Sequence, residues 1–114
     1  MKKIVLLCFC LLTGLPVQAH HGWSSYDASK VMNFSAKVLK SSYENPHGSL
    51  QVDYQGKTWT VILAPVSRMQ ARGLTAEMIQ PGADVQILGY PSKEKKPELR
   101  AESITVNNKK VELR

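Results

Sequence analysis

The sequence predicts a mainly β fold: a small barrel of five strands, with one short helix between the third and fourth strands and a short extra strand at the C-terminus. Two observations predict it. Apolar and polar residues alternate with a period of two in several short segments, as they do in strands with one face in water. This alternation is interrupted once, after Pro65, by a segment without a strand period.

The predicted strands cover residues 32–43, 50–54, 58–63, 85–89, 99–106 and 110–114. The first strand has Phe34, Ala36 and Val38 on one face. It ends at N-P-H-G, residues 45–48, where Asn, Pro and Gly occupy the places that a type I turn prefers. Because Q-G-K at 55–57 is a second short turn, the first three strands should form an antiparallel meander.

The helical segment follows the third strand. Residues 66–72 lack alternation, while Pro65 suits the first turn of a helix and Gly73 suits its end. A second short turn, T-A-E-M-I, follows at 75–79. Three strands, a helix and two strands are the order of the OB barrel, in which the helix covers one end. Because order does not establish closure, an open sheet or half-sandwich is the alternative for residues 32–114.

Residues 1–19 have the features of a cleavable export signal. Lys2 and Lys3 precede an apolar run at 4–12, and a short stretch with small residues ends at Ala19. The run is too short to span a bilayer, and no later segment is apolar for long enough. We therefore predict a periplasmic protein for which the membrane is only the export route, and whose mature chain begins at His20.

Both cysteines, Cys8 and Cys10, lie within this signal, each behind a large residue where a lipidation site has a small one. The mature chain therefore has no thiol, and packing alone must stabilise a single small domain. Loss of Lys2 and Lys3 lowers the formal net charge from +6 to +4. Residues 20–31 form a polar arm in which Trp23 and Tyr26 either pin the arm to the barrel or face a ligand; pinning is the preferred interpretation.

Five segments together resemble one family: H-H-G-W-S-S-Y-D at 20–27, N-P-H at 45–47, W-T-V-I-L-A-P-V-S-R-M-Q-A-R-G-L at 59–74, P-G-A-D-V at 81–85 and E-L-R-A-E-S-I-T-V at 98–106. They are similar to the DUF6152 family of small exported bacterial proteins, which has no assigned activity. The most specific part is an Ala-His-His start paired with a later N-P-H. Members more often continue with Ser-Phe where this chain has Gly22-Trp23. The resemblance implies an exported small barrel and no mechanism.

The three histidines form the candidate site. If His20 is terminal, its α-amine and its imidazole have unperturbed pKa values of about 7.7–8.0 and 6.5, so both lose a proton easily for a metal. A third nitrogen from His47 or His21 would complete a set that copper(II) accepts well, similar to a histidine brace. Zinc prefers four ligands and would need Asp27 or Glu44. We therefore predict copper at His20, His21 and His47.

The distance to His47 is the main objection to this site. In a barrel of this order, the arm enters the first strand at the end opposite to the 45–48 turn. The gap is then a strand length, roughly 40 Å at about 3.3 Å per residue, which an extended arm just spans. The fallback is a local chelate from the His20 amine, its imidazole and His21. The alternative without a metal site is that all three histidines are ordinary polar residues.

Other functional classes have less support. There is no mature cysteine, no G-x-S-x-G elbow and no phosphate-binding glycine loop, so we predict a protein that is not an enzyme. Nucleic acid is not an expected partner, because exposed aromatics are few and the protein is exported. The rival to metal binding is an adaptor barrel that docks a partner protein or an anionic envelope polymer. This adaptor would use basic loops such as 93–98. Two further expectations concern single residues: Arg68 and Arg72 share one helical face, and Trp59 lies in the core.

Overall fold

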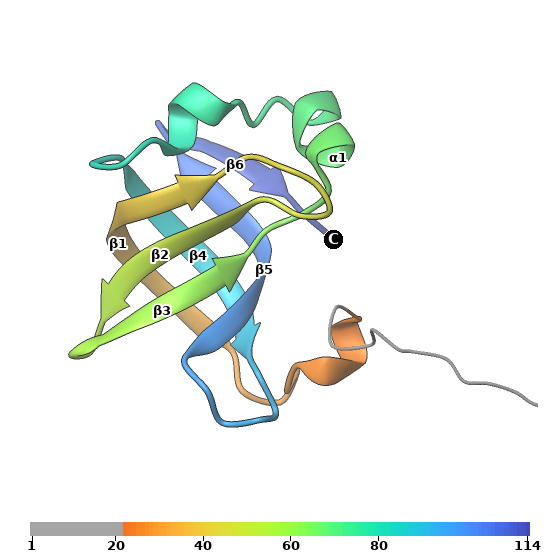
Figure 1. The fold of residues 1–114 in the computed structure, drawn as a ribbon, viewed down its shortest axis with the longest axis vertical. Helices are drawn as coiled ribbons and strands as arrows, with labels where there is room; N and C mark the ends of the chain where they lie inside the picture. The colour runs from red at the N-terminus through yellow and green to blue at the C-terminus, as the bar shows by residue number, and fades with distance from the viewer. Residues whose placement is uncertain (1–21) are drawn as a thin grey trace, which may run out of the picture.

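The computed structural model describes residues 22–114 (Figure 1). Its elements are η2 (Trp23–Ser25), β1 (Met32–Ser42), β2 (Ser49–Tyr54), β3 (Lys57–Ile62), α1 (Val66–Ala71), η3 (Ala76–Ile79), β4 (Asp84–Pro91), β5 (Glu98–Val106) and β6 (Lys109–Glu112). All predicted strands and the predicted helix are present, with ends shifted by no more than two residues. The predicted signal, residues 1–19, lies outside the described residues.

The six strands form one sheet in the order β3-β2-β1-β4-β5-β6, and its first five strands close into a ring. Closure comes from a parallel pairing of β3 with β5, in which Val61 lies beside Leu99. The extra strand, β6, pairs antiparallel with the later part of β5 and lies outside the ring. The predicted OB-like barrel is confirmed, and the open-sheet alternative is wrong.

The core fills the barrel, and each end has its own cover. Val52, Val61 and Ile87 are fully buried inside the ring, because alternation turns one face of each strand inward. One end is covered by the segment that contains α1, through buried Met69 and Leu74. Among residues 22–114, no helix is long and apolar enough to cross a membrane.

At the end opposite to α1, three aromatic rings form a chain. Phe34 stacks on Tyr54 with ring centroids 4.1 Å apart, and the edge of Tyr54 meets Trp59 at 6.4 Å. Trp59, expected in the core, is only half-buried and packs against the core from this end. The barrel therefore has an aliphatic centre, one helical cover and one aromatic cover.

The turn of the β2–β3 hairpin forms as predicted, but the β1–β2 connection differs from the prediction. Gln55 and Gly56 have φ values of 52° and 80°, which suit a two-residue turn of type I′. The connection at residues 43–48 has a cis Asn45–Pro46 peptide bond. The Gly48 amide, which a hydrogen-bonded type I turn would pair with the Asn45 carbonyl, donates instead to the Ala64 carbonyl, so the predicted type I turn at 45–48 is wrong. Tertiary contacts shape this loop instead: the Tyr43 hydroxyl donates a hydrogen bond to the Leu74 carbonyl.

Candidate functional site

The arm turns back along the barrel. The Asp27 amide donates to the Pro91 carbonyl at 2.8 Å, and the Lys93 amide donates to the Ser25 carbonyl at 3.0 Å. Tyr26 forms an antiparallel bridge with Ser92. The Tyr26 side chain is buried, and its hydroxyl donates to Glu98 Oε2 at 2.6 Å. These contacts tie the arm to the β4–β5 loop, residues 92–97.

Trp23 brings the arm onto the outer face of β5. Arg100 alternates with the core residues Leu99 and Ala101, so its side chain lies outside the barrel, yet it is only 4% exposed. The Trp23 ring lies between two guanidinium groups, with its centroid 4.7 Å from Arg100 Cζ and 4.5 Å from Arg114 Cζ. Each such cation–π contact is worth about 0.5–1 kcal/mol at an exposed site and more when desolvated. The prediction that Trp23 and Tyr26 pin the arm is confirmed.

The helix holds the C-terminal partner of Trp23 in place. Arg68 Nη1 donates to the Leu113 carbonyl at 3.0 Å. Arg72 Nη1 donates to the Glu112 carbonyl at 2.8 Å and to the Arg114 carbonyl at 3.1 Å. The two arginines do share one helical face, as predicted, but that face binds the end of the chain. Burial lowers the pKa of Arg100, and the charges of Arg68 and Arg114 act in the same direction.

Of the predicted metal ligands, His20 and His21 lie outside the described residues. His47 lies half-buried in the β1–β2 loop, beside Gly48, whose amide donates to the Ala64 carbonyl at 2.8 Å. Within residues 22–114, no group of three His, Cys, Asp or Glu side chains lies close enough to hold a metal ion. Asp27, the possible zinc ligand, accepts hydrogen bonds from the Ser29 amide and hydroxyl and belongs to the arm near the β4–β5 loop.

The folded-back arm shortens the path to His47. Arg100, on which Trp23 rests, pairs with Ile62, and Ile62 pairs with Ser49, two residues after His47. Adjacent strands lie about 4.8 Å apart, so about 10 Å separates the backbone of Arg100 from that of Ser49. The root of the arm is at the far end of β1, as expected. Through the Trp23 side chain, however, the arm reaches Arg100 on β5, so it does not stay at the far end of β1.

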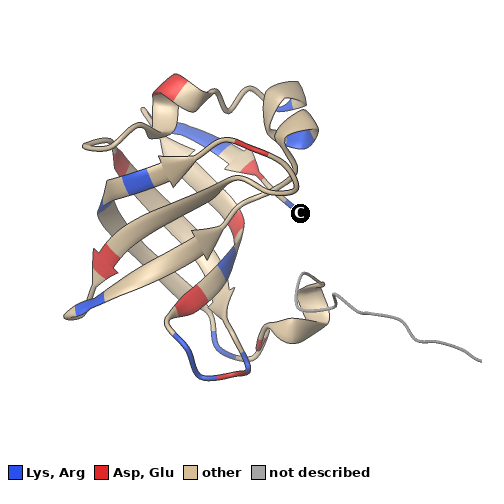
Figure 2. Cartoon of the chain, in the orientation of Figure 1, with Lys and Arg blue, Asp and Glu red and all other residues tan. Residues whose placement is uncertain are grey.

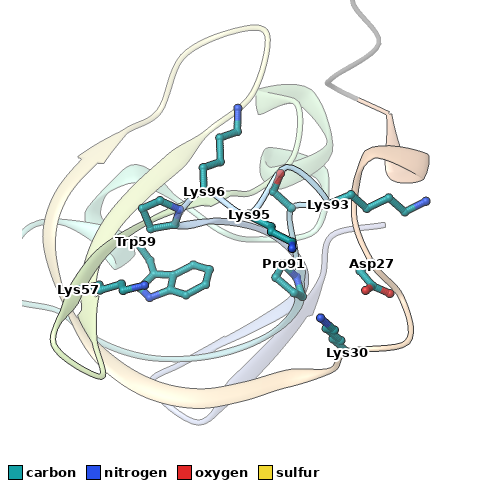
Figure 3. A pocket seen from close by; sticks show the side chains of 10 residues that line it. Asp27, Lys30, Lys57, Trp59, Pro91, Lys93, Lys95 and Lys96 are labelled. Carbon is teal, nitrogen blue, oxygen red and sulfur yellow. The ribbon is translucent and has the colours of Figure 1, made fainter.

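A second feature is a cleft of about 300 Å³ at the aromatic end of the barrel (Figure 3). It is lined by Asp27, Lys30, Lys57, Trp59, Pro91, Ser92, Lys93, Lys95, Lys96 and Pro97. The sequence singled out the loop at 93–98. It did not indicate Lys30, Lys57 or Trp59, because no local pattern shows that the arm, the β2–β3 hairpin and this loop meet.

Three tyrosines are expected to make the protein less stable at high pH. Burial and then the hydrogen bond to Glu98 raise the pKa of Tyr26. The hydrogen bond to Glu102 and then burial raise the pKa of Tyr90, and burial raises that of Tyr43. The folded protein thus holds these protons more tightly than the unfolded chain, whose tyrosines titrate near pH 10. Their contribution to the free energy of unfolding is therefore complete below about pH 10 and decreases above it.

Urea unfolding between about pH 8 and about pH 11, with phenolate absorbance recorded in parallel, measures this effect. The variant Tyr26→Phe should show a shallower decrease than the wild type above about pH 10. Equal slopes for the two proteins would mean that the Tyr26 proton is not coupled to folding.

A closed ring, a covering helix and an arm tied across the outside define this protein as a small OB-like barrel with an N-terminal arm. The chain belongs to DUF6152, a family of unknown function, whose model matches residues 9–100. This confirms the resemblance noted in the sequence. No curated protein matches the chain.

Among solved structures, the chain is similar to one in the crystal structure of a complex of TiaS with an isoleucine tRNA and ATP. The TM-score is 0.51 and the identity is 17%, over 71% of this chain and 19% of that chain. This chain therefore spans about a fifth of the length of the protein it matches. At this identity, the likeness shows the fold alone.

Proposed function

We propose that the mature protein binds copper(II) in the periplasm. The ligands would be the α-amine and imidazole of His20, with a third nitrogen from His47. The fallback remains a local chelate in which His21 supplies the third nitrogen. The role is binding, without a catalytic step carried out by the protein's own side chains.

The path of the arm supports this proposal most directly. Three residues of extended chain, from Trp23 back to His20, span at most roughly 11 Å. This is about the separation between Arg100, under Trp23, and Ser49, near His47. An arm that is pinned beforehand also loses less conformational entropy when its end is fixed by a metal. The arm therefore returns toward the strands beside the His47 loop, which favours a chelate that includes His47.

The donor set favours copper over zinc. An amine and two imidazoles give three nitrogen ligands, which copper(II) accepts well, whereas zinc prefers a fourth ligand. Asp27 is held by Ser29 beside the β4–β5 loop, so it is poorly placed to be that ligand for a site near His47. Glu44 is the remaining carboxylate named for zinc.

The first requirement is the start of the mature chain. Because Ala19 ends the export signal, the protein recovered from the periplasm is expected to begin at His20. Intact mass and N-terminal sequencing measure this directly. Any other start would remove the α-amine from the site and would contradict the proposed ligand set.

The wild-type test is a titration of the metal-free mature protein with copper(II), followed by calorimetry and electron paramagnetic resonance. We expect one tight site with a spectrum of nitrogen ligation. Affinity should fall as the pH is lowered through about 8 and then about 6.5, because the amine and the imidazoles become protonated. Zinc at the same concentration is the matched control. No tight copper binding by protein that begins at His20 would exclude the proposal.

A further inference from the structure

The cleft at the aromatic end of the barrel is built by three segments that are distant in the sequence. The arm contributes Lys30, the β2–β3 hairpin contributes Lys57 and Trp59, and the β4–β5 loop contributes Lys93 and Lys95. Figure 3 shows the Trp59 indole at the hollow, with the Lys30 and Lys95 amines between it and the arm, while the flexible Lys93 and Lys96 side chains extend outward from the rim. The β2–β3 hairpin and the β4–β5 loop that line the cleft lie at the end of the barrel opposite to α1 and to the β1–β2 loop (Figure 1). The cleft is therefore a separate site from the proposed copper site.

The charge of this cleft is strongly positive. Five lysines line it against one carboxylate, Asp27. Lys96 is partly neutralised by Glu94 at 3.2 Å and Glu98 at 3.7 Å. Within the described part of the chain, the other four lysines of the cleft make no ion pair. Figure 2 shows basic residues of the hairpin and of the β4–β5 loop at this same end.

Positive charges crowded around one hollow repel one another. At physiological ionic strength the screening length is about 8 Å, so neighbouring lysines around a cleft of this size still interact. A bound anion would relieve this repulsion. The cleft is thus suited electrostatically to a ligand with more than one negative charge.

The apolar part of the cleft limits the shape of the ligand. Trp59 is fixed from behind by Tyr54 at 6.4 Å, and Tyr54 is fixed by Phe34 at 4.1 Å, so the indole is a rigid surface. Pro91 and Pro97 line the cleft as well. A volume of about 300 Å³ is at the lower limit for small-ligand sites, which suits one or a few rings of a longer molecule. A ring that packs against indole while its anionic groups meet lysines fits this surface.

Single-stranded nucleic acid fits less well. Sequence-independent binding of this kind uses several aromatic side chains on which successive bases stack. Trp59 is the one aromatic residue among those that line the cleft. The cleft therefore offers a stacking surface for one ring and leaves the remaining contacts to the lysines.

We propose that this cleft binds an acidic oligosaccharide, a chain of sugar rings that carry carboxylate groups. One ring packs on Trp59, and the carboxylates of this ring and its neighbours accept hydrogen bonds from Lys30, Lys57, Lys93 and Lys95. The inference does not depend on the proposed copper site. Each site can fail without the other, because the two share no proposed ligand residue.

The test uses metal-free mature protein with a chelator present, so that copper plays no part. The probe is a short galacturonic acid oligosaccharide, and the matched control ligand is a neutral oligosaccharide of the same length. Calorimetry gives the dissociation constant, and the indole N–H resonance of Trp59 reports binding in the cleft. We expect the acidic probe alone to bind, to shift that resonance and to bind more weakly as salt is added.

The informative variant is Lys93→Ala combined with Lys95→Gly. Lys95 has a φ of 62°, a conformation that glycine adopts freely, so its replacement removes charge without strain on the loop. We expect this double variant to bind at least roughly tenfold more weakly, which is about 1.4 kcal/mol. The control, Lys40→Ala with Lys110→Ala, removes the same charge from exposed positions outside the cleft and should leave the affinity within about twofold.

Three outcomes would overturn the proposal. Equal weakening in the control variant would mean general charge attraction. Binding of the neutral probe as tightly as the acidic one would exclude recognition of carboxylates. Tighter binding of a short oligothymidylate than of the acidic sugar would assign the cleft to nucleic acid.

Discussion

The variant His20→Ala is expected to lose copper(II) binding completely. In the proposed site the His20 imidazole is one ligand, and it forms a chelate ring with the α-amine of the same residue. Without this imidazole, the chelate ring that the amine and the His20 side chain form with the metal is lost, and the three-nitrogen set is incomplete. Calorimetry should then show no tight site, and the resonance spectrum should be that of weakly bound copper.

The terminal amine can be tested while every imidazole is kept. A protein with three additional residues, Ser-Gly-Ser, before His20 retains all three histidines and moves the amine away from the His20 side chain, and it places no histidine at the third position, where an amino-terminal copper site would form. We expect it to lose tight binding almost as completely as His20→Ala. Retention of wild-type affinity would show that the amine is not a ligand.

Two single variants distinguish the histidine brace, in which His47 supplies the third nitrogen, from the local chelate, in which His21 supplies it. In the brace, His47→Ala weakens binding at least roughly tenfold, about 1.4 kcal/mol, and His21→Ala changes it little. In the local chelate the two results are exchanged. Because His47 lies in a surface loop and is only half-buried, its replacement should leave the fold intact, as circular dichroism can verify.

Strand positions could be predicted from the sequence because each strand has a core face and a solvent face. Val52 and Val61 are fully buried while Gln51 and Asp53 remain exposed, which reproduces the alternation. The helix could be predicted because Pro65 and Gly73 lie on either side of it. These signals are local, so a single sequence is enough to detect them.

The path of the arm could not be predicted, since it depends on partners distant in the sequence. Trp23 is positioned by Arg100 and Arg114, and Tyr26 by Glu98. No periodicity in residues 20–31 indicates those partners. Their effect is large, because they bring the arm from the root of β1 to Arg100, near the start of β5.

The lysine-lined cleft could not be predicted either, because its residues are also distant from one another in the sequence. A lysine in a loop is usually solvated, and Lys30, Lys57 and Lys95 look ordinary one at a time. The hairpin, the arm and the β4–β5 loop meet only when the ring closes. The cis bond before Pro46 is also absent from the local signal, because the same N-P-H-G letters suit a type I turn.

The close approach of β5 to Gly89 on β4 gives the prediction with the largest effect on stability, for the variant Gly89→Ala. A Cβ atom at position 89 would lie 2.3 Å from the Arg100 carbonyl oxygen and 3.0 Å from Ala101 Cα. Both are backbone atoms, so no side-chain rotation can relieve the clash. Overpacking in a core costs about 1–3 kcal/mol, and here the backbone itself must move. We therefore expect a loss of at least about 3 kcal/mol, or roughly 12 °C or more in Tm for a domain of this size.

The control for this prediction is Gly82→Ala, where an added Cβ meets nothing within 4 Å but φ is 95°. It isolates the cost of backbone conformation, about 1–2 kcal/mol, from the cost of the clash. The clash also has a consequence for the proposed site, because the atom that must move belongs to Arg100, which supports Trp23. At a temperature where Gly89→Ala is still folded, its copper affinity should therefore fall below that of Gly82→Ala. If the two variants were equally stable and bound copper equally, the spacing of β4 and β5 would be adjustable and Arg100 would not position the arm.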